Sequence, residues 1–363
     1  MPCLHVIIMK KNKYDYIILG GGCSGLSLAY HLNIANRLNN KKLCIVEKRK
    51  KYHRDKIWSF WNFEDTQFND CKLNTWKSFR LRSNNKETIV NCEKFPYVSI
   101  DSNLYYNKIL SNLRKNPNIS FFNTVNSLDL NHGIVFNSIP SSFDNDIFYQ
   151  HFHGIEIITK EDCFDPNQFS LMDFTTPNQG IHFFYTLPFN ARKALIETTW
   201  ISKNVNHTQK EYNDELNSYL KNEVRVDNFE ISYSENGCLP LHHTSRKTRK
   251  NEIFIGAPAN MIRKSTGYTF LNIQEHSKYI VDNIDNILNA PVFKLRKKYN
   301  FYDDILFRVI ENNQKKMPEI FRSLFSKNTN SVIKFLSGKS TLINDIQAIM
   351  NLPKTPFLKA LIR

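Results

Sequence analysis

The sequence predicts an α/β protein in which a Rossmann-type dinucleotide-binding domain carries an inserted β-sheet domain and is followed by helices. Three observations predict this fold class. A glycine turn lies between two apolar runs near the N-terminus, strand-like segments fill residues 148–200, and apolar residues recur at helical spacing after residue 291. At 363 residues, the chain is long enough for two interleaved domains.

The dinucleotide fingerprint is the first element. An apolar run leads into Gly20, Gly22 and Gly25, an apolar-periodic segment follows, and a second apolar run ends at Glu47. Gly20 permits the tight turn, Gly22 lets the backbone approach a pyrophosphate, and Gly25 lets the helix pack closely on the sheet. Glu47 stands where a ribose hydroxyl needs an acceptor. Because no second GxGxxG motif recurs, we expect one bound FAD and no separate nicotinamide domain.

The segments that follow alternate between strand and helix. We expect the aromatic stretch from Trp58 to Trp61 on a loop, either as a pocket wall beside the flavin or as core packing. Residues 71–100 alternate apolar and polar side chains, as strands do. Asp101 or Ser102 caps a helix that ends before Pro117. Strands are expected at 119–122 and 135–136.

The middle of the chain is strand-rich. Residues 148–173 and 181–200 read as strands, and a helix is expected over 208–222. A short strand ending at Gly256 leads to Ser265, Thr266, Gly267 and Tyr268, after which a helix is expected to run to about Asn289. A strand, a glycine loop and a helix start form a second anion-binding terminus, so we assign these residues to the cofactor.

These elements define three regions. We expect a discontinuous FAD-binding domain at 13–70, 100–147 and 236–290. A substrate-binding sheet domain is expected at 71–99 and 148–235, and a helical region at 291–363. The apolar face of the last region, edged by lysines and arginines, either packs on the domain or faces a membrane.

The amino-acid composition limits the kinds of binding partner that we expect for this protein. The net charge of +15 favours an anionic partner or reflects a basic solvated surface. No basic stripe with interleaved aromatic residues indicates nucleic acid, and no run of 18 apolar residues indicates a membrane span. The seven cysteines form no CxxC pair, and the histidines lack ligand spacing, so we expect reduced thiols and no metal. We therefore expect a cytoplasmic protein associated peripherally with the inner face of the membrane.

Several blocks together resemble the lycopene cyclase family. They are residues 15–25, 58–61, 184–188, 195–199, 235–240 and 265–268, with further matches at 335–339 and 352–353. The resemblance implies a flavoprotein with a glutathione-reductase-like FAD domain. It further implies an isomerase-type enzyme that closes the ends of lycopene, or a related linear carotene, into rings without net oxidation. In that family the FAD acts in its reduced form, NAD(P)H is the implied external reductant, and Glu197 matches the acid.

The chemistry of ring closure suits the candidate residues. Protonating an alkene requires a carboxylic acid that burial keeps neutral, and the resulting cation requires negative charge and aromatic faces. Glu197 is the first candidate for the acid; Glu235 is the second, or it shapes the loop beside the flavin. The candidate pocket residues are Trp58, Phe60, Trp61, Phe184, Tyr185 and Trp200.

The sequence departs from the family pattern at two places, and two other functions remain open. Asn137, Ser138 and Ile139 stand where the family commonly has Asp-Ser-Arg or Asp-Gly-Arg. Ala259 and Asn260 stand where it often has paired glycines. The alternatives are a flavin-dependent monooxygenase or desaturase that acts on an isoprenoid, and a flavin or carotenoid binder that has lost activity.

Overall fold

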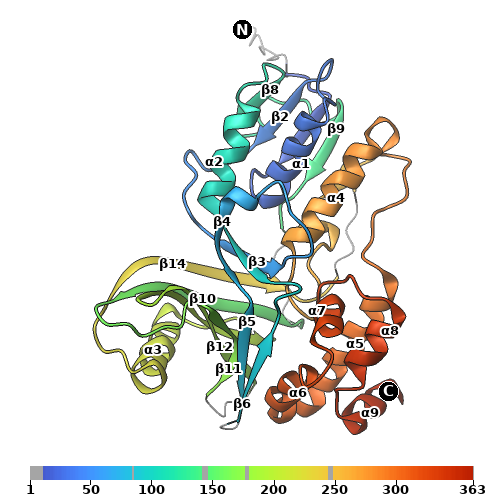
Figure 1. Ribbon diagram of the computed structural model, residues 1–363. Helices are drawn as coiled ribbons and strands as arrows, with labels where there is room; N and C mark the ends of the chain where they lie inside the picture. The colour runs from blue at the N-terminus through green and yellow to red at the C-terminus, as the bar shows by residue number, and fades with distance from the viewer. Residues whose placement is uncertain (1–10, 84–85, 141–145, 176–179, 244–247, 363) are drawn as a thin grey trace, which may run out of the picture.

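The computed structural model describes residues 11–83, 86–140, 146–175, 180–243 and 248–362. Figure 1 shows a parallel sheet with its helices at the top, a broad sheet beneath it, and a group of C-terminal helices beside the broad sheet.

The parallel sheet has the strand order β15-β9-β1-β2-β8. Its strands are β1 (Tyr16–Leu19), β2 (Leu43–Val46), β8 (Ile119–Phe122), β9 (Ile134–Asn137) and β15 (Glu252–Phe254). Helices α1 (Cys23–Ile34), α2 (Ser102–Leu113) and α4 (Phe270–Asp282) belong to the same layer, in which α1 packs against both others. Every residue of β1 and β2 is buried, which explains why these strands read as continuous apolar runs.

A small antiparallel sheet has the order β3-β7-β4. Its strands are β3 (Ile57–Trp61), β4 (Lys72–Trp76) and β7 (Tyr97–Asp101). Our expectation of a loop at 58–61 is wrong, because Trp58 to Trp61 pair with Ile100 to Tyr97. The tertiary structure extends this aromatic stretch because pairing with β7 lets Phe60 and Trp61 be buried.

The broad sheet has the order β14-β10-β13-β12-β11-β5-β6. Its strands are β5 (Ser78–Ser83), β6 (Lys86–Asn91), β10 (Tyr149–Thr159), β11 (Gln168–Phe174), β12 (Ile181–Asn190), β13 (Lys193–Ser202) and β14 (Phe229–Pro240). Helix α3 (Gln209–Tyr219) covers one face of this sheet (Figure 1) and begins with a capping box of Thr208 and Glu211. A π-helical turn, η2 (Leu220–Val224), ends α3.

The helical C-terminal region confirms the expectation for residues after 291. It contains α5 (Lys297–Asn313), α6 (Met317–Leu324), α7 (Thr329–Leu336), α8 (Leu342–Ile349) and α9 (Lys354–Ile362). Short 3-10 turns are η1 (Asn69–Cys71), η3 (Ala257–Ala259), η4 (Ile284–Asn286) and η5 (Gln314–Lys316). Helix α4 ends at Asp282, earlier than expected, and its apolar stripe continues through η4, where Ile284 is buried. Within the described residues, no helix combines the length and apolarity needed to cross a bilayer.

Candidate functional site

The fingerprint glycines lie at the carboxyl end of β1. Gly20 has a φ of +96°, which favours glycine, and a Cβ on Gly25 would lie 1.9 Å from the carbonyl oxygen of Gly20. A Cβ on Gly22 would meet only Arg49, at 3.9 Å, so the backbone there faces open space. Gly20 and Gly25 therefore shape the turn, and Gly22 leaves room in front of the N-terminus of α1, where a pyrophosphate fits.

Glu47 lies beside the same turn, at the end of β2. Its carboxylate accepts the backbone N–H groups of Gly21 (2.8 Å) and Arg49 (3.0 Å), and it pairs with the Arg49 guanidinium at 3.3 Å. Partial burial alone would raise the pKa of Glu47, but these hydrogen bonds and the charge of Arg49 hold it below its ordinary value. Glu47 is therefore an ionised carboxylate at the carboxyl end of β2, beside the glycine turn.

Gly256 completes this end of the sheet. It follows β15 with a φ of +69°, and a Cβ on Gly256 would lie 2.8 Å from the side chain of Ser24 at the start of α1. Glu47, the glycine turn and Gly256 thus lie together around the start of α1, the position at which a fold of this kind can hold a dinucleotide. At the nearby departure from the family pattern, Asn260 has a φ of +61°. Asparagine tolerates this left-handed conformation, so the backbone remains accessible without the glycine found in the family.

The other departure from the family pattern, at residues 137–139, is partly explained by the structure. Ser138 donates a hydrogen bond to the Leu19 carbonyl oxygen at 2.8 Å, and Asn137 donates to Glu252 at 2.9 Å. These contacts fasten β9 to its neighbours β1 and β15. Nothing in the structure explains the isoleucine at position 139.

The predicted cofactor loop at 265–268 lies against the broad sheet. Gly267 has a φ of +69°, and a Cβ there would come within 2.6 Å of the Gln150 side chain on β10. Thr266 accepts the backbone N–H of Tyr268 at 3.3 Å, and the Ser265 N–H donates to Asp303 at 3.4 Å. The loop therefore joins the broad sheet to the C-terminal helices, immediately before α4 begins.

Glu197 and Glu235 form a buried carboxyl pair on the broad sheet. Glu197 on β13 and Glu235 on β14 both lie opposite Gly154 on β10, the strand between them. Residues at facing register positions point to the same side of a sheet, so both side chains extend over Gly154. They are 8% and 4% exposed, and their carboxyl groups are hydrogen-bonded to each other.

Gly154 makes this pairing sterically feasible. A Cβ at position 154 would lie 2.8 Å from Cγ of Glu197 and 3.3 Å from Leu195. Any other residue would require the Glu197 side chain to shift. Our sequence reasoning missed Gly154, although a single glycine within a run of β-formers is a known signal of close approach by another group.

The surroundings of the pair place its proton on Glu197. Glu235 accepts the Ile57 backbone N–H and the Tyr233 hydroxyl, each at 2.9 Å, and Lys56 lies near enough to favour its charge. Burial raises the pKa of Glu235 above its ordinary value, and these contacts make that rise smaller. Burial and the neighbouring Glu235 raise the pKa of Glu197 well above its ordinary value. Of the two carboxyl groups, Glu197 therefore holds a proton more strongly.

Tyr185 connects the pair to the cofactor loop. It lies opposite Glu197 on β12, and its hydroxyl donates to that of Tyr97 at 3.1 Å. Tyr97 is in turn hydrogen-bonded to Tyr268. The structure thus brings Glu197, Glu235, Tyr185 and Tyr268 into one polar cluster between the broad sheet and the cofactor domain.

Phe184 and Trp200 are separated from Glu197 by the sheet itself. Phe184 stacks on Tyr219 of α3 with ring centroids 3.9 Å apart, and Trp200 donates to Glu215 of α3 at 3.2 Å. Alternate residues of a strand point to opposite faces, so these two side chains lie under α3. This corrects our expectation that they share a pocket with Glu197.

The aromatic residues of β3 pack against different partners. Trp61 is fully buried and packs on Tyr97 with ring centroids 4.6 Å apart. Trp58 and Phe60 both stack on Phe270, the first residue of α4. Of the six predicted pocket residues, Tyr185 alone faces Glu197 across a strand pair in the part of the chain that the structure describes.

An ion-pair cluster borders the carboxyl pair. Glu156, two residues after Gly154, is 1% exposed and pairs with Arg54 at 2.7 Å and Lys193 at 2.8 Å. Arg54 also pairs with Asp101 of β7 at 3.1 Å and lies over the Tyr233 ring, 4.1 Å from its centroid. Arg54 therefore connects the broad sheet to the small sheet beside Glu235.

Among the described residues, no group of three His, Cys, Asp or Glu side chains is arranged to hold a metal ion.

Comparison with protein families identifies one match. The model of the family described as lycopene cyclase protein matches residues 15–362, nearly the whole chain. A search of curated proteins finds no significant match.

Solved structures share the fold. A geranylgeranyl bacteriochlorophyll reductase-like protein from Thermoplasma acidophilum is 13% identical, with a TM-score of 0.60 over 96% of this chain and 95% of its own. A flavin-dependent brominase is 10% identical, with a TM-score of 0.61 over 90% and 94%. A flavoprotein/dehydrogenase from Cytophaga hutchinsonii is 10% identical, with a TM-score of 0.60 over 94% and 99%. At these identities the likeness concerns the fold, and it confirms the predicted Rossmann-type α/β class.

Proposed function

Because this chain belongs to the lycopene cyclase family, we propose that it closes the ends of a linear carotene such as lycopene into rings, without net oxidation. The observation that carries this proposal is the buried pair of Glu197 and Glu235, in which burial and the neighbouring Glu235 raise the pKa of Glu197 so that it keeps its proton. Ring closure of an alkene requires a proton donor in a site that excludes water, and the buried Glu197 carboxyl group, which keeps its proton, meets both requirements.

In the proposed reaction, Glu197 donates its proton to the terminal double bond. A tertiary carbocation forms, the neighbouring double bond attacks it, and a new carbon–carbon bond closes the ring. Loss of a proton from the ring then restores neutrality, so the reaction has no net change in protons or electrons. The Glu197 carboxylate formed in the first step can receive that proton.

In this proposal, the carboxylate of Glu235 supplies the negative charge that stabilises the carbocation. A carbocation offers no hydrogen-bonding group, so a nearby negative charge stabilises it most effectively where water is excluded. The hydrogen bonds from Ile57 and Tyr233 fix the Glu235 carboxylate in place. The ring of Tyr185 offers an aromatic face beside Glu197.

We propose FAD as the cofactor, held by Gly20, Gly22, Gly25, Glu47 and Gly256 at its nucleotide end and by residues 265–268 at its ring end. When bound in its reduced form, FAD supplies further negative charge next to the developing cation. The N-terminus of α4, which follows the 265–268 loop, would favour that charge. NAD(P)H is the proposed external reductant.

The decisive test is Glu197→Gln in cells that accumulate lycopene. We expect ring formation to be abolished, since glutamine cannot donate a proton to an alkene, while the purified protein keeps its flavin absorbance. The control is Glu230→Gln, an exposed glutamate on the same strand as Glu235, which should cyclise normally. Normal cyclisation by the Glu197→Gln variant would disprove the assignment of the acid.

The two alternatives make different predictions. A monooxygenase needs oxygen and a desaturase needs an electron acceptor, whereas ring closure should proceed under anaerobic conditions without an added acceptor once the flavin is reduced. A protein purified without any yellow flavin would instead favour a binder that has lost activity. Product analysis with and without oxygen therefore separates the three functions.

We also propose that the enzyme reaches its apolar substrate at a membrane surface. Helix α8 turns most of its apolar side chains outward: Leu342 is 70% exposed, Met350 just beyond its end is 74% exposed, and Ile343 and Ile346 lie between them. An exposed apolar patch on a basic protein suits contact with an anionic bilayer, in which a linear carotene dissolves.

A further inference from the structure

A half-buried aromatic side chain, Phe152, stands next to the carboxyl pair on the same face of the broad sheet. It precedes Gly154 on β10 by two residues, and alternate residues of a strand point to the same side. Its register partners are Thr199 on β13 and Gly237 on β14. This face therefore carries one row of Glu197, Gly154 and Glu235, and beside it a second row of Thr199, Phe152 and Gly237.

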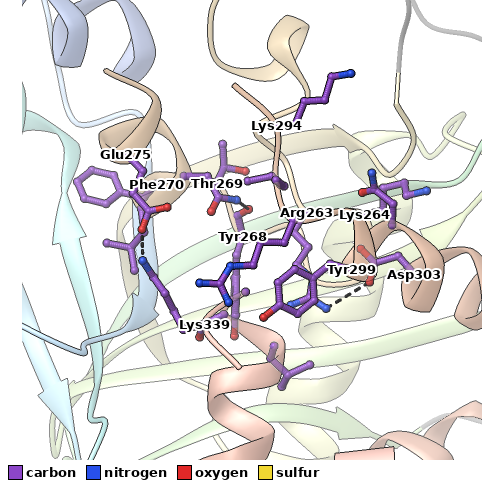
Figure 2. Close-up of a pocket in the computed structure, with 18 of the residues that line it drawn as sticks. Arg263, Lys264, Tyr268, Thr269, Phe270, Glu275, Lys294, Tyr299, Asp303 and Lys339 are labelled. Carbon is purple, nitrogen blue, oxygen red and sulfur yellow. Dashed lines mark hydrogen bonds and ion pairs between the residues drawn. The ribbon is translucent and has the colours of Figure 1, made fainter. Parts of the chain in front are cut away.

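A third row connects this face to the cofactor loop. It contains Gln150 of β10 and Leu239 of β14. A Cβ on Gly267 would lie 2.6 Å from the Gln150 side chain and 3.4 Å from Leu239, so the loop covers this row. Figure 2 shows Tyr268 of the same loop in the wall of the cavity at the start of α4, which is the proposed ring end of the flavin site. Phe152 thus lies in the row between the carboxyl pair and the cofactor loop.

Gly237 provides the space for the Phe152 ring. A Cβ on Gly237 would lie 2.3 Å from Cε1 and Cζ of Phe152, so the outer edge of the ring lies directly over this glycine. Any other residue at position 237 would require the ring to shift. The two glycines of this face therefore have matching roles, because Gly154 accommodates the carboxyl pair and Gly237 accommodates the ring.

The hydrophobic core does not account for Phe152. Within the part of the chain that the structure describes, it joins none of the hydrophobic clusters. The ring instead lies near a cation, because the Lys56 ammonium is 5.8 Å from its centroid, within the range of a cation–π interaction. Lys56 also donates a hydrogen bond to the Asn236 carbonyl oxygen and is half-buried. The two register partners of Phe152 carry no charge, so the ring is the group of this row that can stabilise a positive charge.

We propose that the Phe152 ring stabilises the carbocation formed at the end of the carotene chain, opposite the carboxyl pair. This inference rests on the proposed ring closure. Rows two residues apart on a strand are separated by about 7 Å, so a methyl-branched chain end between them can contact both the Glu197 carboxyl group and the ring. A carbocation offers no hydrogen-bonding group, and a π face stabilises it without acting as a base. Because Lys56 is partly exposed, its ammonium can turn toward solvent when the chain end occupies the ring.

The test replaces Phe152 with phenylalanines that carry one, two or three ring fluorine atoms, which weaken the π face while the ring keeps nearly the same shape. The measurement is the cyclisation of lycopene in lipid vesicles with reduced FAD. We expect log kcat to fall steadily as fluorine atoms are added. Phe152→Leu should lower kcat roughly thirtyfold, because a desolvated cation–π contact contributes about 2 kcal/mol. KM should change little, since the cation exists only after the substrate has bound.

The matched control is the same fluorine series at Phe184, which stacks on Tyr219 of α3 on the opposite face of the sheet. We expect kcat to be unchanged there, and urea unfolding should show that every variant folds. A flat series at Phe152, or an equal decline at Phe184, would overturn the inference. If the wild type closes no ring, the proposed function is wrong and this inference falls with it, whereas normal ring closure by every Phe152 variant excludes the role of the ring alone.

Discussion

At the scale of single residues, the protonation of Glu197 depends on its burial and on one neighbour, Glu235. The carboxylate of Glu235 is fixed by the Ile57 N–H and the Tyr233 hydroxyl, and its charge adds to burial in raising the pKa of Glu197. A carboxyl group whose pKa is raised is neutral below that pKa and ionises as the pH rises through it. Cyclisation should therefore be lost on the alkaline side.

Replacing Glu235 by Gln should move this alkaline loss of activity to lower pH. Removing the adjacent negative charge lowers the pKa of Glu197, so the acid ionises earlier as the pH rises. The measurement is cyclisation rate against pH, compared with the wild type. An unchanged or upward-shifted alkaline limb would show that Glu235 does not set the pKa of Glu197.

The same raised pKa has a consequence for stability. Because the folded protein holds the Glu197 proton to higher pH than the unfolded chain does, the free energy of unfolding should fall as the pH rises from the ordinary carboxyl pKa toward the raised one. Glu197→Gln should remove this contribution. Urea unfolding at several pH values should then give a flatter profile for the variant than for the wild type.

Gly154 should not tolerate a side chain. Gly154→Ala would bring its Cβ to 2.8 Å from Cγ of Glu197, and we expect a loss of about 1–3 kcal/mol in unfolding free energy with a large loss of cyclisation. In a Glu197→Ala background, which lacks that Cγ, the same change should cost less. An equal cost in both backgrounds, measured by urea unfolding, would place the clash elsewhere.

At the scale of elements, the site depends on how strands β3, β10 and β14 meet. Arg54, just before β3, connects Asp101 on β7 with Glu156 on β10 and lies over Tyr233 on β14. Glu156 is almost fully buried, so losing Arg54 would leave its charge with Lys193 alone. This contact holds Ile57 of β3 where its N–H can reach Glu235.

Arg54→Met should therefore destabilise the protein by about 3 kcal/mol, as expected when one partner of a buried ion pair is removed. The matched control is Arg192→Met, which breaks an ion pair with Asp162 at the surface and should change little. Urea unfolding of the two variants provides the comparison. Equal stability of Arg54→Met and the wild type would mean that the cluster does not hold the sheets together.

At the scale of the protein as one body, the apolar face of α8 is left uncovered by the described part of the fold. Within that helix, Asp345 and Ala348 are buried, whereas Leu342, Ile343 and Ile346 face outward. A helix packed on a core normally buries its large apolar side chains, whereas α8 exposes them. This exposure supports the proposed membrane contact.

The double variant Ile343→Ser, Ile346→Ser should bind anionic vesicles more weakly in a sedimentation assay, while its unfolding free energy stays within about 0.5 kcal/mol of the wild type. Ile231→Ser, an exposed isoleucine on β14, is the control and should bind normally. Equal sedimentation of all three proteins would exclude α8 as the contact surface.

Much of the architecture could be predicted from the sequence, because the type of each helix, strand or turn follows from the pattern of residues within it. The turn at Gly20 to Gly25 requires special backbone conformations and close packing, and strands β1 and β2 must be apolar because both faces are covered. The helices after residue 291 follow from periodicity alone. The stretch from Trp58 to Trp61 was misplaced because its partner strand β7 lies far along the chain, and tertiary pairing decides such cases.

Local sequence patterns are enough to predict the dinucleotide-type fold and two candidate glutamates in this protein. The meeting of Glu197 and Glu235 follows from the three-dimensional fold, because they lie on strands separated by β10 and their contact depends on its register at Gly154. It also decided that Phe184 and Trp200 lie on the opposite face from Glu197. Local patterns record the type of each element, whereas long-range hydrogen-bond register determines which side chains share a site.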